Sequence, residues 1–224
     1  MLLRRLRLGP ARAPWAILIT VTAVAVSACA GPSTPSFNPD GPCGIDGRIA
    51  GAYPDLESRL PTTFEGAAAN SVDSGRHCSQ SALGSLIVHN VSSVQFAGAT
   101  WDLGGGTALS SAIFRLPDAD LPAPWIEEFY ELGARTAKRT ENIEVGRPTF
   151  AGPGQVFRLD TLNSLSLQTV LVWQDGPFVR VVLVATPVAP DRSRAAHDDL
   201  VSRAVAATVM AAPVVSIVAV PGSG

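Results

Sequence analysis

The sequence lacks any recognisable catalytic or metal-binding motif. Its 224 residues include only three histidines, no two of them at metal-ligand spacing, and contain no HExxH, CxxC or GxSxG pattern. The one cluster of a histidine with carboxylates is His197, Asp198 and Asp199. Consecutive helix residues point about 100° apart, so we expect these three side chains to form a solvent-facing first turn rather than to converge. We therefore expect no catalytic residue, no metal and no cofactor.

Basic charge is scarce beyond the N-terminal segment. The chain has 17 basic and 19 acidic residues, and four of the basic ones, all arginine, precede Cys29, where there is no acidic residue. Without those four, 13 basic residues face 19 acidic ones, a net charge of −6. Nucleic-acid binding therefore has no electrostatic support, and we expect no nucleic-acid partner.

No hydrophobic run reaches the length of a bilayer-spanning helix. The uncharged stretch 13–28 is shorter than the ~20 apolar residues that a span needs. It follows a basic segment and ends in small residues before a cysteine, which is the anatomy of a secretory signal. The apolar stretch 211–220 is interrupted by Pro213, so we expect an ordered edge segment or a loose tail there.

The end of this signal, Val26-Ser27-Ala28-Cys29, resembles the lipobox of bacterial lipoproteins. In that family the cysteine is diacylated on sulfur, for example with palmitate, and becomes the N-terminus after cleavage. The resemblance implies that Cys29 carries the lipid and that Val26, Ser27 and Ala28 form the cleavage context. Two or three acyl chains anchor stably, whereas one binds only marginally, so we expect a protein tethered to the extracytoplasmic side of the cell membrane.

Two cysteines, Cys43 and Cys78, remain after the lipidated one. In an exported protein such a pair indicates a disulfide. The alternative is a reactive thiol at Cys78, which stands just before a helix start and beside His77. Residues 30–40 hold three prolines and little to bury, which is typical of a flexible spacer. We expect a signal peptide over 1–28, a spacer over 29–42, one domain over 43–210 and a tail over 211–224.

The stretch 165–185 predicts a central β-hairpin. Two β-branched and aromatic runs flank the turn signal Asp175-Gly176, and both runs are apolar almost continuously, so we expect them to lie mid-sheet or to be covered on both faces. Val172 and Val182 should then be core residues. Arg180 should reach solvent at the hairpin end or pair with a carboxylate such as Asp160.

Further strands are expected on both sides of a long helix. Residues 93–103 and 107–116 flank three glycines and predict a second hairpin; a phosphate cradle would need a helix after the glycines, and here a strand follows. Residues 143–150 and 155–161 predict a strand pair. A first strand is expected over 64–71.

Helices are expected over 54–60, 79–90, 124–138 and from Pro190 to about residue 209. The second has a weak point at Gly84, and the last has Asp191 or Ser193 as its cap and a buried stripe. That stripe comprises Val201, Ala204, Val205 and Thr208. The third helix has an apolar stripe that comprises Ile126, Phe129, Tyr130, Gly133 and Ala137. It also carries Glu127, Glu128 and Glu131, which invite an interpretation as catalytic carboxylates. The helix dipole and a Glu131–Arg135 pair explain them as a solvated face.

Consecutive hairpins rather than strand–helix alternation predict an α+β domain, a mainly antiparallel sheet with about three helices packed on one face. This element order is similar to that of the Mog1/PsbP-like lipoproteins of actinobacteria, whose members are small secreted sheets backed by helices. We expect a non-catalytic domain that binds a small molecule, an envelope component or a protein. The alternative is a cell-surface hydrolase with a scattered site. Convergent ionisable groups in a pocket would favour the hydrolase, and an apolar groove would favour binding.

Overall fold

A computed structural model describes residues 37–163, 165–188 and 193–211, all of which belong to the compact unit Pro35–Gly224. The predicted signal peptide, the lipobox with Cys29, Pro190 and Asp191 at the expected start of the last helix, and the tail beyond residue 211 lie outside these residues. Among the helices that are described, none is long and apolar enough to cross a bilayer.

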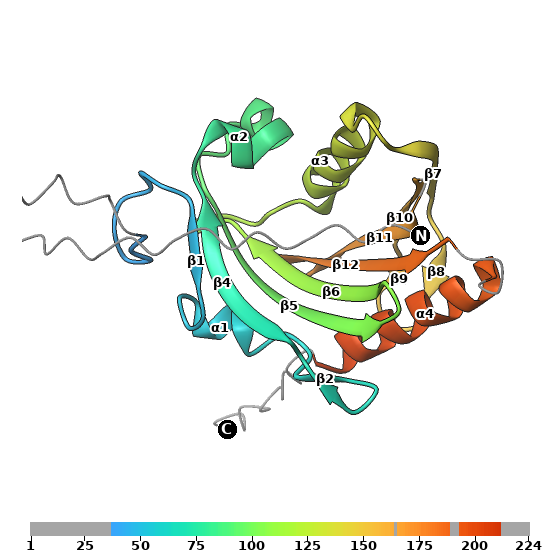
Figure 1. The fold of residues 1–224 in the computed structure, drawn as a ribbon. Helices are drawn as coiled ribbons and strands as arrows, with labels where there is room; N and C mark the ends of the chain where they lie inside the picture. Colours follow the sequence, from blue (N-terminus) through green and yellow to red (C-terminus); the bar gives the residue numbers. More distant parts are fainter. Residues whose placement is uncertain (1–36, 164, 189–192, 212–224) are drawn as a thin grey trace, which may run out of the picture. The chain divides into compact units, whose positions relative to one another are not determined.

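The fold is built on an antiparallel eight-stranded sheet with the order β1-β4-β5-β6-β12-β11-β10-β7 (Figure 1). The α+β class predicted from the sequence is confirmed. The strands of the sheet are β1 Gly47–Ile49, β4 Ser71–His77, β5 Val94–Gly104, β6 Thr107–Arg115, β7 Glu141–Gly146, β10 Phe157–Leu162, β11 Ser166–Asp175 and β12 Phe178–Pro187. The strand expected over 64–71 is instead a small hairpin, β2 Thr63–Phe64 with β3 Ala67–Ala68, and a second small hairpin joins β8 Thr149–Phe150 to β9 Gly154–Gln155.

The described residues contain four α-helices and one 3-10 helix. They are α1 Pro54–Glu57, α2 Gln80–Leu83, η1 Gly84–His89, α3 Ala123–Thr136 and α4 Arg194–Met210. The predicted helix over 79–90 is thus interrupted at its weak point, because Gly84 has φ +53°. Helix α4 begins with the expected cap, since the Ser193 hydroxyl accepts a hydrogen bond of 3.1 Å from the Ala196 amide.

The predicted central hairpin is formed by β11 and β12, which pair throughout their length in the interior of the sheet. Asp175 lies opposite Phe178, and Gly176 provides the positive φ of the turn. Val172 and Val182 are fully buried, as expected. Their side chains belong to different clusters, one on each face of the sheet, so the continuous apolar runs reflect burial on both sides.

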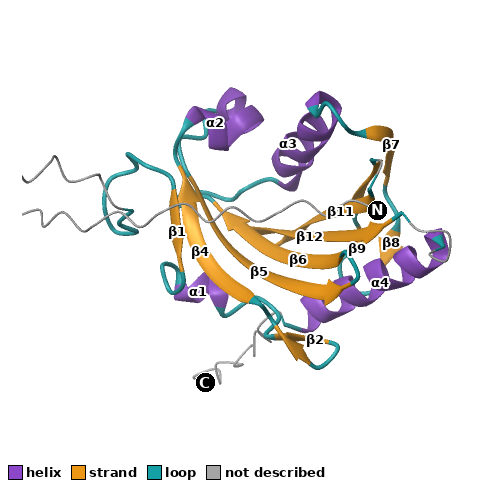
Figure 2. Cartoon of the chain, viewed as in Figure 1, coloured by secondary structure: helices purple, strands orange, loops and turns teal. Residues whose placement is uncertain are grey.

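The helices cover both faces of the sheet, which corrects the expectation of one covered face (Figure 2). One core contains Leu56 of α1 and the predicted stripe of α4 together with Trp101 and Trp173. The other contains Leu86 of η1 and Ile126 of α3. The sequence prediction failed because an amphipathic helix reveals its own apolar side but not the face of the sheet that this side meets.

Arg180 is buried rather than exposed to solvent, and it pairs with a carboxylate, which is the other of the two outcomes expected from the sequence. Its side chain is only 1% exposed, and its Nε lies 2.6 Å from the Asp175 carboxylate across the hairpin. Its Nη1 donates to the Arg59 carbonyl at 2.8 Å. The carboxylate named as a candidate, Asp160, pairs with Arg158 and Arg194 instead.

A disulfide and an arginine hold the first residues of the domain in place. Cys43 and Cys78 form the predicted disulfide, with their Cα atoms 5.7 Å apart, so Cys78 is not a free thiol. Beside it, the buried Arg76 guanidinium donates hydrogen bonds of 2.7–3.3 Å to four backbone carbonyls in the segment 38–42. The last residues of the predicted spacer are therefore held against β4.

Candidate functional site: an apolar cavity between α3 and η1

The most ligand-like cavity lies where α3 and the α2–η1 segment meet the sheet. It has a volume of about 530 Å³ and is bounded by residues of α3, of the α2–η1 segment and of the sheet. Its lining comprises Ser81, Gly84, Ser85, Phe129, Tyr130, Leu132, Gly133, Ala134, Thr136, Ala137, Thr140, Leu159, Thr161, Gln168, Val170 and Leu183. Helices α2 and α3 stand over this side of the sheet in Figure 1.

The floor of the cavity is a row of apolar side chains across three neighbouring strands. Leu159 of β10 lies opposite Val170 of β11, which lies opposite Leu183 of β12. Directly opposed residues point to the same face of a sheet, so the three side chains form one continuous surface. The next row, Thr161 and Gln168, adds polar atoms at one side of this floor.

The α3 wall is apolar and, in its second half, made of small residues. Phe129, Gly133 and Ala137 follow one another at intervals of four and so share one side of the helix. The Phe129 ring closes the cavity against the α2–η1 junction, since a Cβ atom on Gly84 would lie 3.0 Å from it. Beyond the ring, glycine and alanine leave space between α3 and the sheet, and exposed residues such as Leu132 mark the mouth.

Ser85 and Tyr130 are among the lining residues whose hydroxyl groups have no hydrogen-bond partner in the part of the chain that the structure describes. Ser85 is 8% exposed, and its Oγ is buried without a partner. Tyr130 is half-buried, and burial raises the pKa of its hydroxyl to about 12. Buried polar groups in proteins are nearly always hydrogen-bonded, so unpaired hydroxyls at a cavity are places where a ligand or water can bind.

Among the residues that the structure describes, no charged side chain lines this cavity. Two exposed basic residues, Lys138 and Arg139, follow the lining residue Ala137 in the chain. The sequence analysis distinguished a pocket with convergent ionisable groups, which favours a hydrolase, from an apolar groove, which favours binding. This cavity is of the second kind. The cavity has the composition of a binding site for an apolar molecule.

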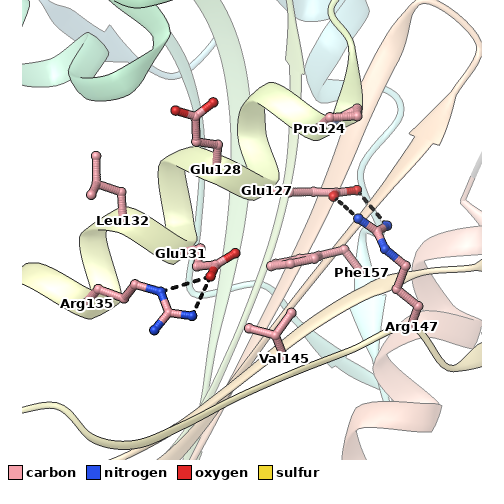
Figure 3. A pocket seen from close by; sticks show the side chains of 9 residues that line it. All are labelled: Pro124, Glu127, Glu128, Glu131, Leu132, Arg135, Val145, Arg147 and Phe157. Atoms are coloured by element: carbon pink, nitrogen blue, oxygen red, sulfur yellow. Dashed lines mark hydrogen bonds and ion pairs between the residues drawn. The ribbon is translucent and has the colours of Figure 1, made fainter.

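A second pocket, of about 460 Å³, lies on the other side of α3 and contains the three glutamates (Figure 3). Each carboxylate has a different partner. Glu127 pairs with Arg147, Glu131 with Arg135 in the predicted i,i+4 pair, and Glu128 with His89. The three carboxylates line one pocket, but each is paired with a different basic side chain rather than with another carboxylate, as a catalytic pair would be. Glu127 is buried, however, which corrects its assignment to the solvated face.

His197 is buried rather than solvent-facing, contrary to the sequence prediction, and both of its ring nitrogens are used. Thr169 Oγ1 lies 2.7 Å from Nε2 and also donates to the Asp160 carboxylate, so Nε2 must donate to Thr169. Thr186 Oγ1 lies 2.8 Å from Nδ1, which accepts. Burial lowers the pKa of His197, and the neutral ring that results fits this arrangement.

The two carboxylates after His197 point elsewhere, as predicted. Asp198 pairs with Arg158, and Asp199 with Arg203 four residues later. Within the described ranges, no group of three or more metal-ligating side chains is present. The cluster therefore stabilises the contact of α4 with the sheet, where Arg158 and Arg194 reach Asp160.

The cavity was not predicted from the sequence, although part of its lining was. The apolar stripe of α3 indicated Phe129, Tyr130, Gly133 and Ala137 as a core face, without any signal that this face leaves a space. The one local sign of a space is that two small residues, Gly133 and Ala137, stand in that stripe in place of the large apolar residues that fill a core. Comparisons of the chain with protein-family models, with curated proteins and with solved structures found no match to any of them.

Proposed function

We propose that this protein is a membrane-anchored lipoprotein whose domain binds a small apolar ligand without transforming it. The observation that carries the proposal is the cavity between α3 and η1, with its floor of Leu159, Val170 and Leu183 and no charged lining residue. Its volume of about 530 Å³ falls within the ~300–1,000 Å³ that small-molecule sites occupy.

The tether in this proposal comes from the lipobox resemblance, in which Cys29 carries the acyl chains. The domain end of the tether is held by Arg76 at residues 38–42. The chain from Cys29 to Asn38 spans at most ~32 Å when fully extended. A lipidated Cys29 would therefore keep the cavity close to the membrane, where apolar molecules are concentrated.

Filling the cavity mouth tests the proposal. A Cβ atom on Gly133 would have no neighbour within 4 Å, so the side chain of Gly133→Leu starts in open space at the cavity. We expect the purified wild-type protein to bind the uncharged hydrocarbon probe diphenylhexatriene, with an increase in its fluorescence. Gly133→Leu should weaken this binding by at least about tenfold, which corresponds to 1.4 kcal/mol.

The matched control is Gly146→Leu on the edge strand β7. Its added side chain also enters open space, and Gly146 lies outside the cavity lining. The control should bind the probe as the wild type does, and thermal melts should show all three proteins folded. A wild-type protein that does not bind the probe, or a Gly133→Leu variant that binds it normally, would contradict the proposed function.

A further inference from the structure

We propose that the ligand of this cavity is an uncharged apolar molecule with a hydroxyl group, which hydrogen-bonds to Tyr130 Oη and Ser85 Oγ. This inference rests on the proposed function and adds the chemical class of the ligand. It depends on the polar atoms of the lining, on their missing partners, and on the charges that are absent from it.

The Tyr130 hydroxyl is the first of these atoms. Its ring packs at 5.5 Å, edge to face, against Phe129, which fixes the side chain in the wall of the cavity. The residue is half-buried and lines the space, and its hydroxyl makes no hydrogen bond with any residue that the structure describes. Its raised pKa keeps the phenol protonated, so it can both donate and accept.

The Ser85 hydroxyl is the second atom, and it comes from the opposite wall. Ser85 follows Gly84 at the α2–η1 junction and is more than nine-tenths buried. Its Oγ is without a partner, which normally costs about 1–3 kcal/mol for a buried polar group. The Oγ has almost no exposed surface in this conformation, so rotation about χ1 is needed to turn it from the wall toward a ligand hydroxyl in the cavity.

The charges argue against an ionised ligand head inside the cavity. A carboxylate there would lose its hydration, and no lining side chain would neutralise it. The competing arrangement places an anionic head outside, at Lys138 and Arg139 beside the mouth. Both are exposed, and they show none of the burial that marks a built site. The unpaired hydroxyls inside therefore favour the neutral ligand.

Competition between a long-chain alcohol and the matching acid tests this inference. Tetradecanol and tetradecanoate differ only in the head group, and each is titrated against bound diphenylhexatriene at neutral pH. We expect tetradecanol to bind at least about tenfold more tightly. Tyr130→Phe and Ser85→Ala should each reduce the affinity for tetradecanol, relative to that for the probe, by about 2–12-fold, the range for one lost hydrogen bond. The ratio is the readout because a general change in packing affects both molecules.

The outcomes separate this inference from the proposed function. Failure of the probe and both competitors to bind would overturn the proposed function. Binding of the probe with equal affinities for alcohol and acid, or with ratios unchanged by both substitutions, would overturn the inference alone. Preferred binding of the acid that is lost in Lys138→Ala and Arg139→Ala would place the head group at the mouth and would also overturn it.

Discussion

At the scale of single residues, the sequence did not reveal which polar side chains are buried. Arg180 and His197 both look like surface residues, yet they are 1% and 2% exposed. Most of their polar atoms find partners on other elements, Asp175 and the Arg59 carbonyl for the arginine and two threonines for the histidine, although Arg180 Nη2 has none among the described residues. Which side chains meet across elements is not evident until the fold is known. Val172 and Val182 needed no partner, and their burial was predictable.

His197 gives the domain a defined dependence on pH. Burial lowers the pKa of His197 from its ordinary 6.5; Asp160 and Asp198 oppose this shift, and Arg158 and Arg194 reinforce it. As the pH falls through 6.5, the unfolded chain takes up a proton that the folded state refuses. The free energy of unfolding should therefore decrease. Burial alone would raise the pKa of Asp198, but the Arg158 hydrogen bond and the positive charges of Arg158 and Arg194 together lower it below the ordinary 3.8, so this carboxylate does not titrate in this range.

The measurement is denaturant unfolding of the wild type and of His197→Gln at pH values of about 7.5 and about 5.5, on either side of the histidine range. The difference in unfolding free energy between the two pH values should be smaller in the variant, whatever its absolute stability. Some dependence should remain, since burial also lowers the pKa of His77. An identical difference in both proteins would show that His197 does not titrate as described.

At the scale of elements, hairpins were predictable and polar strands were not. The arms of β11–β12 are rich in β-branched residues, and both β11–β12 and β5–β6 meet at glycine turns. Strand β4 reads Ser-Val-Asp-Ser-Gly-Arg-His and carries no such signal. It is a strand because β1 and β5 pair with it on both sides. Gly75 permits the approach of β1, since a Cβ atom there would lie 2.1 Å from the Gly47 carbonyl oxygen.

Replacement of glycine by alanine should have opposite effects on stability at Gly84, in the break between α2 and η1, and at Gly133, inside α3. Gly84 combines φ +53° and ψ −126°, which L-residues avoid, and a Cβ atom would crowd Phe129. Gly84→Ala should lower the free energy of unfolding by about 1–3 kcal/mol. Gly133 lies inside α3 with open space beside it, and Gly133→Ala should raise it by about 0.5–1 kcal/mol. Chemical denaturation measures both, and shifts of the same sign would disprove the local account.

At the scale of the whole molecule, the sequence indicated the class of the fold but not the arrangement that creates a site. Runs such as Val170 to Trp173 are apolar on both faces, so they fit helices on either side of the sheet. The cavity depends on the sizes of the side chains along α3. Phe129 contacts the α2–η1 junction and so fixes the separation of α3 from it, and the small residues that follow on α3 leave a space above the sheet. A space of this kind arises from packing over long sequence distances.

The central claim is that this space holds a neutral apolar ligand, and a crystal structure of the protein with tetradecanol tests it most directly. The account predicts the alkyl chain over Leu159, Val170 and Leu183, with its hydroxyl within hydrogen-bonding distance, about 2.5–3.0 Å, of Tyr130 Oη. An empty cavity with the alcohol bound elsewhere on the protein would contradict it.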